Sequence, residues 1–395
     1  MYFLDLTLET LLRTFYVHIS HSLIYNVIGD YMKILIATGG TGGHIYPAIS
    51  LADYLASNYK DNTFMFVGNA DRMESTIIPQ LGYRFLGIEA ARFNGPLAGN
   101  KIQALKTLYK SYQECLKVVD SFKPDIIVGF GGYVTVPVVM AGVRSHVKTV
   151  IHEQNSFAGM ANKALGHFAN KVITVYPQVN SSFPKRKVVN LGNPRESAVL
   201  DLVVDKRNLE TFGFDIKKKT VLIVMGSLGS ASVNDRMVEI LNAMKEKDYN
   251  VIYVTGKNNY DAMIRQVSES DNVRIVPYID QFKIASCCDL VISRGGATSA
   301  CEYMALGLPS IIIPSPFVTN NHQYYNAKSM VDNGASLLIE EKDLTSELLL
   351  EKVDELLGDD MKLADMSKAA RKMSHPYAAK EISELLYQVA GKKYE

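Results

Sequence analysis

The segment Gly39-Gly40-Thr41-Gly42-Gly43-His44 is the part of the chain whose residue types are best suited to chemistry. Glycines permit positive φ and close backbone approach, so several N–H groups and a helix start can converge on a phosphate. No Gly-Lys-Ser/Thr follows, which excludes a Walker-type loop. His44 closes the turn and can titrate near neutrality, so it is a candidate to accept a proton from a reacting hydroxyl. Packing at the helix start is the alternative role for His44.

Two further segments of the same half follow predicted strands. Gly131-Gly132-Tyr133 follows a strand over 126–129, and Glu153 and Asn155 follow a strand over 147–152. Because ligands of open α/β sheets bind beyond the carboxyl ends of the strands, the three turns point to one site. Capping of the next helix is the alternative for Glu153 and Asn155. The sequence does not decide whether His44 or Glu153 is the general base.

The second half carries residues suited to a nucleotide. The run 226–230, Gly-Ser-Leu-Gly-Ser, offers hydroxyls and N–H groups to a diphosphate, and Glu302 offers a carboxylate that both ribose hydroxyls can share. The polar cluster over 321–326 supplies amides for sugar hydroxyls. The chain contains no Asp-x-Asp triplet, so we expect helix N-termini, backbone N–H groups and basic side chains, without a metal ion, to meet the leaving-group charge.

The elements that position these residues repeat a strand–turn–helix order twice. Continuous Ile/Val runs bounded by glycine are typical of parallel strands that are buried on both faces. The second predicted strand, over 63–67, leads into Gly68-Asn69 where a dinucleotide dehydrogenase would have an acidic residue, which disfavours that class. We predict an α/β protein of two doubly wound, Rossmann-like domains that face a central cleft. Further strands are expected at 33–37, 126–129, 147–152, 171–175, 220–225, 251–255, 273–276, 290–293 and 310–314. After the glycine-rich turn, a helix is expected to begin near Pro47.

A length of 395 residues with 47% hydrophobic content fits two domains. We place an N-terminal extension at 1–31, a first domain at 32–194, a second domain at 195–375 and a C-terminal helix within 376–395 that can pack back on the first domain. The extension has neither a basic start with a cleavage site nor an uninterrupted apolar span. The four cysteines lack metal or disulfide spacing and indicate a reducing compartment.

The positive charge belongs to the first domain. Residues 32–195 hold 18 Lys and Arg against 9 Asp and Glu, a net charge of +9, whereas residues 196–395 hold 23 against 29, or −6. This balance favours a polyanion or an anionic membrane surface, with a scattered solvated surface as the alternative. No basic run with interleaved aromatics indicates nucleic acid.

With these motifs the sequence resembles the bacterial UDP-N-acetylglucosamine:undecaprenyl-diphospho-muramoylpentapeptide N-acetylglucosaminyltransferases, the MurG family, which are family 28 glycosyltransferases of the two-Rossmann GT-B type. The resemblance implies an inverting, metal-independent and cofactor-free transfer of N-acetylglucosamine from UDP to the C4 hydroxyl of the muramoyl sugar of lipid I, giving lipid II for peptidoglycan. The matching segments span nearly everything after Met32: GGTGGHIYPA (39–48), NADRMES (69–75), GFGGYVTVPVVMA (129–141), HEQNSFAGMANK (152–163), GNPR (192–195), MGSLGS (225–230), RGGATSACEYMALGLPSIIIPSP (294–316) and NHQYYNA (321–327).

The resemblance also implies roles for single residues. His44 and Glu153 become the catalytic candidates, and Gly131, Gly132 and Tyr133 lie on the acceptor side. The residues implied to bind UDP-N-acetylglucosamine are Thr41, Gly42, Gly43, Asn155, Arg195, Ser227, Ile279, Ala297, Thr298, Ser299, Glu302 and Gln323.

The implied partners are UDP-N-acetylglucosamine, undecaprenyl-linked lipid I, the anionic inner membrane surface and other cell-wall and division proteins. The implied location is peripheral, on the cytoplasmic side of the bacterial cell membrane. Lys101, Lys106 and Lys110, with neighbouring apolar residues, form a basic amphipathic stretch that fits such a surface, and an ordinary surface helix is the alternative. Competing functions are another GT-B UDP-sugar enzyme, with a different acceptor or an epimerase activity, and a non-catalytic nucleotide-sugar-binding scaffold.

Overall fold

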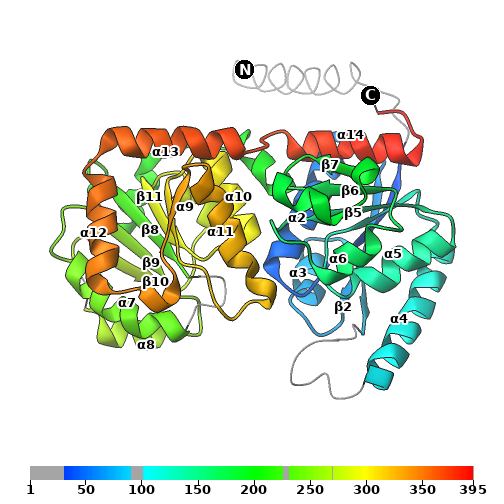
Figure 1. Cartoon of the computed structure of the whole chain (residues 1–395), viewed down its shortest axis with the longest axis horizontal. Helices are drawn as coiled ribbons and strands as arrows, with labels where there is room; N and C mark the ends of the chain where they lie inside the picture. Colours follow the sequence, from blue (N-terminus) through cyan, green and yellow to red (C-terminus); the bar gives the residue numbers. More distant parts are fainter. Residues whose placement is uncertain (1–30, 90–100, 226–230, 269, 395) are drawn as a thin grey trace, which may run out of the picture.

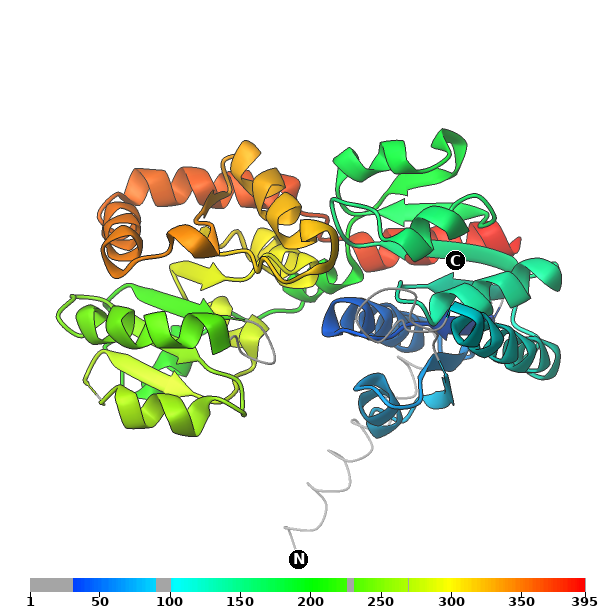
Figure 2. The same cartoon turned by 60° about the horizontal axis from the view of Figure 1, so that its bottom comes forward.

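The computed structural model describes residues 31–89, 101–225, 231–268 and 270–394, and these form two α/β halves that lie side by side (Figures 1 and 2). The first half alternates strands and helices from Lys33 to Asn190. Its elements are β1 (Lys33–Ala37), α2 (Gly42–Asn58), β2 (Thr63–Asn69), α3 (Glu74–Gln80), β3 (Arg84–Ile88), α4 (Lys101–Phe122), β4 (Ile126–Gly129), α5 (Thr135–Arg144), β5 (Lys148–Glu153), α6 (Met160–Leu165), β6 (Lys171–Thr174), two short 3₁₀ helices, η1 (Pro177–Ser182) and η2 (Lys185–Lys187), and β7 (Val188–Asn190).

Two 3₁₀ helices, η3 (Pro194–Val199) and η4 (Lys206–Phe212), lead into the second half, which repeats the alternation. Its elements are β8 (Thr220–Val224), α7 (Ala231–Met244), β9 (Asn250–Val254), α8 (Tyr260–Gln266), β10 (Val273–Val276), α9 (Gln281–Ala285), β11 (Leu290–Ser293), α10 (Ala297–Leu306), β12 (Ser310–Ile312), η5 (Thr319–Asn321), α11 (His322–Asp332), β13 (Ser336–Leu338), η6 (Glu341–Asp343), α12 (Ser346–Leu357), α13 (Asp360–Met373) and α14 (Ala378–Ala390).

Both sheets are parallel and reverse their order beside their first strand. The first runs β3-β2-β1-β4-β5-β6-β7 and the second runs β10-β9-β8-β11-β12-β13. This is the doubly wound arrangement expected from the sequence, and the predicted fold class is confirmed. In such sheets the crevice for a ligand opens beyond the carboxyl ends of the central strands.

The central strands are buried on both faces. In β1, Ile34 and Ile36 pack with α2 and α14, while Leu35 and Ala37 pack with α4 and α5 on the other face. The same alternation divides β8 between two core clusters. Since successive strand side chains point to opposite faces, an apolar run without alternation is the sequence that such a strand requires.

Helix α2 begins at Gly42 and not near Pro47, where the sequence had suggested its start. Pro47 lies inside the helix and has no N–H for the carbonyl of Gly43, four residues earlier. The hydroxyl of Thr298 in α10 donates to that carbonyl at 2.9 Å. The early proline is tolerated because the second half replaces the missing donor. The short edge strands β3, β7 and β13 were not predicted, since three to five residues carry little periodicity.

The chain crosses twice between the halves, at 192–199 and at 374–377. The carboxylate of Glu196 ties the crossings together, because it accepts the N–H of Asn193 at 2.9 Å and the N–H of His375 at 2.5 Å. Burial raises the pKa of Glu196 to about 7. After the second crossing α14 packs on the first sheet, with Ile382 and Leu386 in its core, and α13 and α14 run along one side of the molecule (Figure 1).

Candidate functional site

The glycine-rich turn lies where β1 ends and α2 begins, as its sequence predicts. One of its N–H groups is already used: the N–H of Gly40 donates to Oε1 of the buried Glu74 at 3.1 Å, with Gly40 at φ +92°. Thr41 is the N-cap of α2, and its side chain makes no capping bond. The first N–H groups of α2, at Gly42 and Gly43, have no carbonyl of their own helix to bind and are the donors that suit an anion.

The contacts of His44 favour one tautomer. Its Nδ1 lies 3.1 Å from the carbonyl oxygen of Gly39 and 3.4 Å from Oγ1 of Thr41. A carbonyl only accepts and a hydroxyl can also accept, so we assign the proton to Nδ1, and the neutral ring then keeps its lone pair on Nε2. Burial lowers the pKa of His44 below its usual 6.5, against the opposing effect of the Gly39 bond. A histidine that is neutral at pH 7 and has an unprotonated Nε2 has the properties of a general base.

The Gly131-Gly132 turn packs directly against this loop. Both glycines have positive φ, +97° and +82°. A Cβ on Gly131 would lie 2.9 Å from Nε2 of His44, and a Cβ on Gly132 would lie 2.6 Å from the oxygen of Gly39. Only glycines allow this approach, so the turn forms the wall beside the imidazole. Tyr133, the third residue assigned to the acceptor side, is partly exposed at the end of the turn.

Glu153 is surrounded by donors from its own loop. Oε1 accepts two bonds from Asn155, at 3.1 Å from the backbone N and 3.2 Å from Nδ2, and Oε2 accepts from the N–H of Gly159 at 3.0 Å and from Nδ2 of Asn162 at 2.9 Å. Burial raises the pKa of this carboxyl, and these bonds lower it in part. Four acceptor contacts leave little capacity to take a substrate proton. This geometry favours His44 over Glu153 as the base and gives Glu153 the task of shaping the loop.

Two side chains of the second half reach the first-half loops. The bond from Thr298 to the Gly43 carbonyl brings the N-terminus of α10 to the glycine-rich turn. Asn326 in α11 is fully buried; its Oδ1 accepts the Ser156 N–H at 2.8 Å, and its Nδ2 donates to Oδ1 of Asn155 at 3.2 Å. The two halves therefore meet at the carboxyl ends of their sheets, as ligand binding between them requires.

Arg195 and Glu302 form an ion pair although 107 residues separate them. Nε and Nη2 of Arg195 donate to Oε1 of Glu302 at 2.8 and 2.6 Å. Among the described residues, Oε2 of Glu302 receives one long bond of 3.3 Å, from Gln281. Burial raises the pKa of Glu302, and the Arg195 guanidinium opposes that shift. A carboxylate that is oriented through one oxygen and loosely held at the other can accept hydroxyl groups of a ligand.

The other predicted residues fall in three places. Gln323 lies in the first turn of α11, where its Oε1 accepts the N–H of Ser315 at 2.8 Å. Ile279 is buried beside the exposed Tyr278 in the loop after β10. Ala297 and Ser299 lie with Thr298 in the first turn of α10. Ser227 lies outside the described residues.

Two buried polar residues of the site were not predicted in their actual roles. Glu74 was not singled out from the sequence, and Asn326 was expected within the cluster 321–326 to offer its amide to sugar hydroxyls, whereas that amide is bonded within the protein. Both occur in segments that carry the family resemblance, 69–75 and 321–327. The available signal was a polar residue at the start of α3 and another within α11, but the sequence alone does not show that a single polar residue of a helix is buried.

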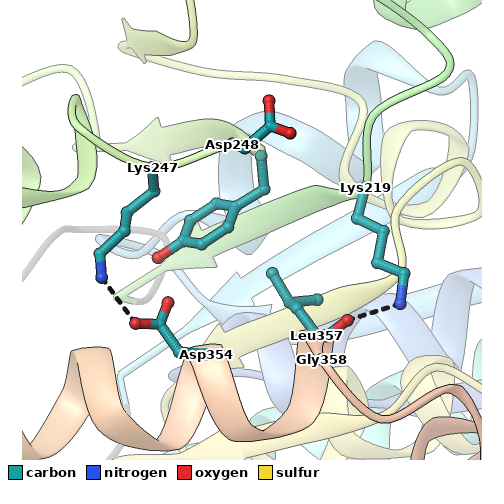
Figure 3. A pocket seen from close by; sticks show the side chains of 7 residues that line it. Lys219, Lys247, Asp248, Asp354, Leu357 and Gly358 are labelled. Atoms are coloured by element: carbon teal, nitrogen blue, oxygen red, sulfur yellow. Dashed lines mark hydrogen bonds and ion pairs between the residues drawn. The ribbon is translucent and has the colours of Figure 1, made fainter.

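A hollow lies at the end of the second sheet opposite the candidate site (Figure 3). Lys219, Lys247, Tyr249, Asp354 and Leu357 line it, before the amino ends of β8 and β9. Lys247 pairs with Asp354 at 2.6 Å, and Lys219 donates to the carbonyl of Leu357 at 2.6 Å. Ligands of parallel sheets bind at the carboxyl ends, so we assign no substrate to this hollow.

Comparisons with known proteins identify the family of this chain. The Glycosyltransferase family 28 N-terminal domain model matches residues 34–174, and the C-terminal domain model matches 220–382. A protein of Bacillus cytotoxicus, the UDP-N-acetylglucosamine–N-acetylmuramyl-(pentapeptide) pyrophosphoryl-undecaprenol N-acetylglucosamine transferase, is 40% identical over 91% of this chain and 100% of its own length.

Two solved structures show the same architecture. MurG of Acinetobacter baumannii has a TM-score of 0.72 at 26% identity, over 91% of this chain and 99% of its own. A UDP-GlcNAc 2-epimerase of Neisseria meningitidis has a TM-score of 0.65 at 16% identity, over 90% and 100%, which shows the shared fold alone. Since both family models and a full-length relative match, the chain belongs to glycosyltransferase family 28 and, within it, to the MurG family of N-acetylglucosamine transferases.

Proposed function

We propose that this enzyme transfers N-acetylglucosamine from UDP-N-acetylglucosamine to the C4 hydroxyl of the muramoyl sugar of lipid I, with inversion at C1. The Bacillus relative named for this transfer aligns over its whole length. The structural observation that carries the proposal is the bond from Thr298 to the Gly43 carbonyl, which joins a nucleotide-side helix start to the turn that holds His44.

The proposed reaction moves one proton and one electron pair. The acceptor hydroxyl attacks C1 of the donor sugar, and Nε2 of His44 takes the hydroxyl proton. The new O4–C1 bond forms as the bond from C1 to the diphosphate oxygen breaks, and UDP leaves with the electron pair. The N-terminus of α10 and the first N–H groups of α2 stabilise the charge that develops on the diphosphate.

We assign the second half to UDP. Oε2 of Glu302 accepts the ribose hydroxyls and displaces its long contact with Gln281, while Arg195 keeps the carboxylate oriented. Ala297 to Ser299 face the diphosphate, and the backbone of Ile279 flanks the uracil. The family resemblance assigns Ser227 to the diphosphate as well. Gln323 donates to the sugar through its amide nitrogen, since its oxygen is held by Ser315.

The activity test is transfer of label from UDP-[¹⁴C]N-acetylglucosamine to lipid I. We expect a β-linked product, and equal rates with and without EDTA. Loss of all activity in EDTA would contradict the metal-independent mechanism. UDP-N-acetylglucosamine incubated without an acceptor should stay unchanged; its conversion to a different UDP-sugar would instead support the epimerase alternative.

We further propose that α4 holds the enzyme to an anionic membrane surface. No helix in the described ranges has the length and apolar character needed to cross a bilayer. Ile102, Leu105 and Tyr109 of α4 are 57 to 66% exposed, and Lys106 and Lys110 lie among them. An exposed apolar strip with interspersed lysines is suited to the interface of an anionic bilayer.

Reversing the charges of Lys106 and Lys110 to glutamate is expected to weaken binding to vesicles of anionic phospholipid by at least about tenfold. Each lysine near such a surface contributes about 1 kcal/mol, and the reversal adds repulsion. Sedimentation with vesicles at two salt concentrations measures the change. The matched control reverses Lys217 and Lys257, which are exposed on the second half. Equal loss in both variants, or none in either, would contradict a specific role for α4.

A further inference from the structure

A single peptide group lies between the buried carboxylate of Glu74 and the imidazole of His44. The carbonyl of Gly39 accepts the Nδ1–H of His44 at 3.1 Å, and the N–H of Gly40, at the other end of the same peptide, donates to Oε1 of Glu74 at 3.1 Å. The order of groups is carboxylate, peptide, imidazole. Neither the glycosyl transfer proposed above nor a simple turn requires a carboxylate at this position.

The chain provides space for Glu74 and holds it firmly. Its side chain has no exposed surface. Oε1 also accepts the backbone N–H of Asn69 at 3.0 Å and the side-chain amide of Asn69 at 2.5 Å. A Cβ on Gly39 would lie 2.2 Å from Oε1, and a Cβ on Gly68 would lie 2.7 Å from Cγ of Glu74. Two glycines of the site are therefore required by the carboxylate itself.

The placement affects the imidazole electrostatically. A carboxylate at the N–H end of a peptide polarises it, so that its carbonyl oxygen becomes a stronger acceptor for the Nδ1–H. Of the described groups that act on the charge of His44, the carboxylate of Glu74 and the carbonyl of Gly39 favour the imidazolium. Burial and His322 on α11 oppose it. The neighbouring His152 on β5 has its own pKa lowered to about 4, by burial and in part by His44. A base that must become charged during the reaction gains from a negative group fixed behind it.

We propose that Glu74 is a positioning residue for the base: through the Gly39–Gly40 peptide it fixes the Nδ1–H tautomer of His44 and stabilises the imidazolium formed as the acceptor hydroxyl is deprotonated. This inference rests on the proposed role of His44 as the base. Glu74 itself touches no substrate, so its removal acts through His44.

The first test needs no activity. In protein labelled with ¹⁵N-histidine, the NMR signals of His44 are identified by their absence in His44→Asn. In the neutral ring they should show a protonated Nδ1 and an unprotonated Nε2. In Glu74→Gln, which keeps the shape and removes the charge, the pKa of His44 should fall further. A neutral ring of the wild type with the proton on Nε2, or an unchanged His44 titration in Glu74→Gln, would overturn the proposal.

The second test is kinetic. Glu74→Gln is expected to lower kcat about tenfold to a hundredfold, within the range for assistance to general base catalysis, with little change in KM for UDP-N-acetylglucosamine. The acid limb of the pH profile should move to lower pH, because the neutral base then persists at lower pH. Asp71→Asn, which removes an exposed charge three residues away, is the control and should behave as wild type.

The outcomes separate the two proposals. If Glu74 only braces the turn, Glu74→Gln changes KM or thermal stability and leaves the acid limb in place, which refutes the inference. If His44 is not the base, His44→Asn retains turnover, and the NMR titration still reports whether Glu74 acts on the imidazole. If Glu74→Gln fails to fold, two other measurements test the proposal. One is the tautomer of His44 in the wild type. The other is the His44 titration in Glu74→Asp, which retains the charge and should keep the pKa of His44.

Discussion

His44→Ala is expected to lower kcat by about 10²- to 10⁴-fold, the usual contribution of a general base, with KM for UDP-N-acetylglucosamine nearly unchanged. The reason is geometric: Nδ1 is fixed on the Gly39 carbonyl, so Nε2 is the nitrogen left to take the proton. Steady-state transfer to lipid I measures the effect. His167→Ala, which removes an exposed histidine of the same domain, should leave kcat unchanged.

His44→Asn separates catalysis from support of the turn. The asparagine amide can replace Nδ1–H as a donor to Gly39 but cannot accept a proton at the position of Nε2. We expect this variant to be as slow as His44→Ala. Near wild-type turnover would show that His44 only holds the turn and that another group is the base.

The same histidine sets the expected pH dependence. Its pKa is lowered by burial, and the unprotonated ring is the active form, so kcat/KM should rise with pH and then level off. The acid limb should lie below the ordinary histidine pKa of about 6.5. A limb centred above pH 7 would indicate that another group titrates.

Glu302→Gln is expected to weaken UDP binding about 10- to 100-fold, because a hydrogen bond to a charged group contributes about 1.5 to 3 kcal/mol. Glutamine keeps the volume and an oxygen for Arg195, so the fold should persist, which a thermal melt checks. Calorimetric titration with UDP measures the loss. Glu347→Gln, an exposed carboxylate of the same half, is the matched control.

A comparison of UDP with its 2′-deoxy analogue tests whether Glu302 contacts the ribose. Wild-type enzyme should bind 2′-deoxy-UDP more weakly than UDP, because one partner of Oε2 is missing. In Glu302→Gln that difference should nearly vanish, whereas any loss caused by a disturbed Arg195 would affect both ligands equally. Equal discrimination in both proteins would place Glu302 away from the ribose.

The sequence predicted the strands of both halves correctly where a local pattern of residue types was enough to indicate them. The Ile/Val runs of β1 and β8 are long enough to indicate buried parallel strands, and the glycines after β1 mark the turn that carries His44. The start of α2 was misplaced for a tertiary reason. A proline inside a helix leaves a carbonyl without its donor, and only the folded chain shows that Thr298 supplies one.

Glu153 shows the limit for single residues. A glutamate at the end of a strand is equally suited to catalysis and to capping. Which role it has depends on how many N–H groups surround its carboxylate in the folded protein. Glu74 presents the converse case. In the sequence it is one of two acidic residues in the segment Asp71 to Glu74. Only the two glycines that pack against it in the structure show that the site is built around its carboxylate.

The sequence by itself determined the fold class, the glycine-rich turn that opens the first domain and the family, because strand periodicity, glycine spacing and contiguous motifs are local properties of the chain. The tertiary structure decided which groups meet: Arg195 with Glu302, Gly43 with Thr298, and His44 with Glu74 through one peptide. Those pairings join segments 30 to 255 residues apart. Hydrogen bonds and charges act over a few ångströms, so the protonation state and orientation of each group follow from packing that no local pattern encodes.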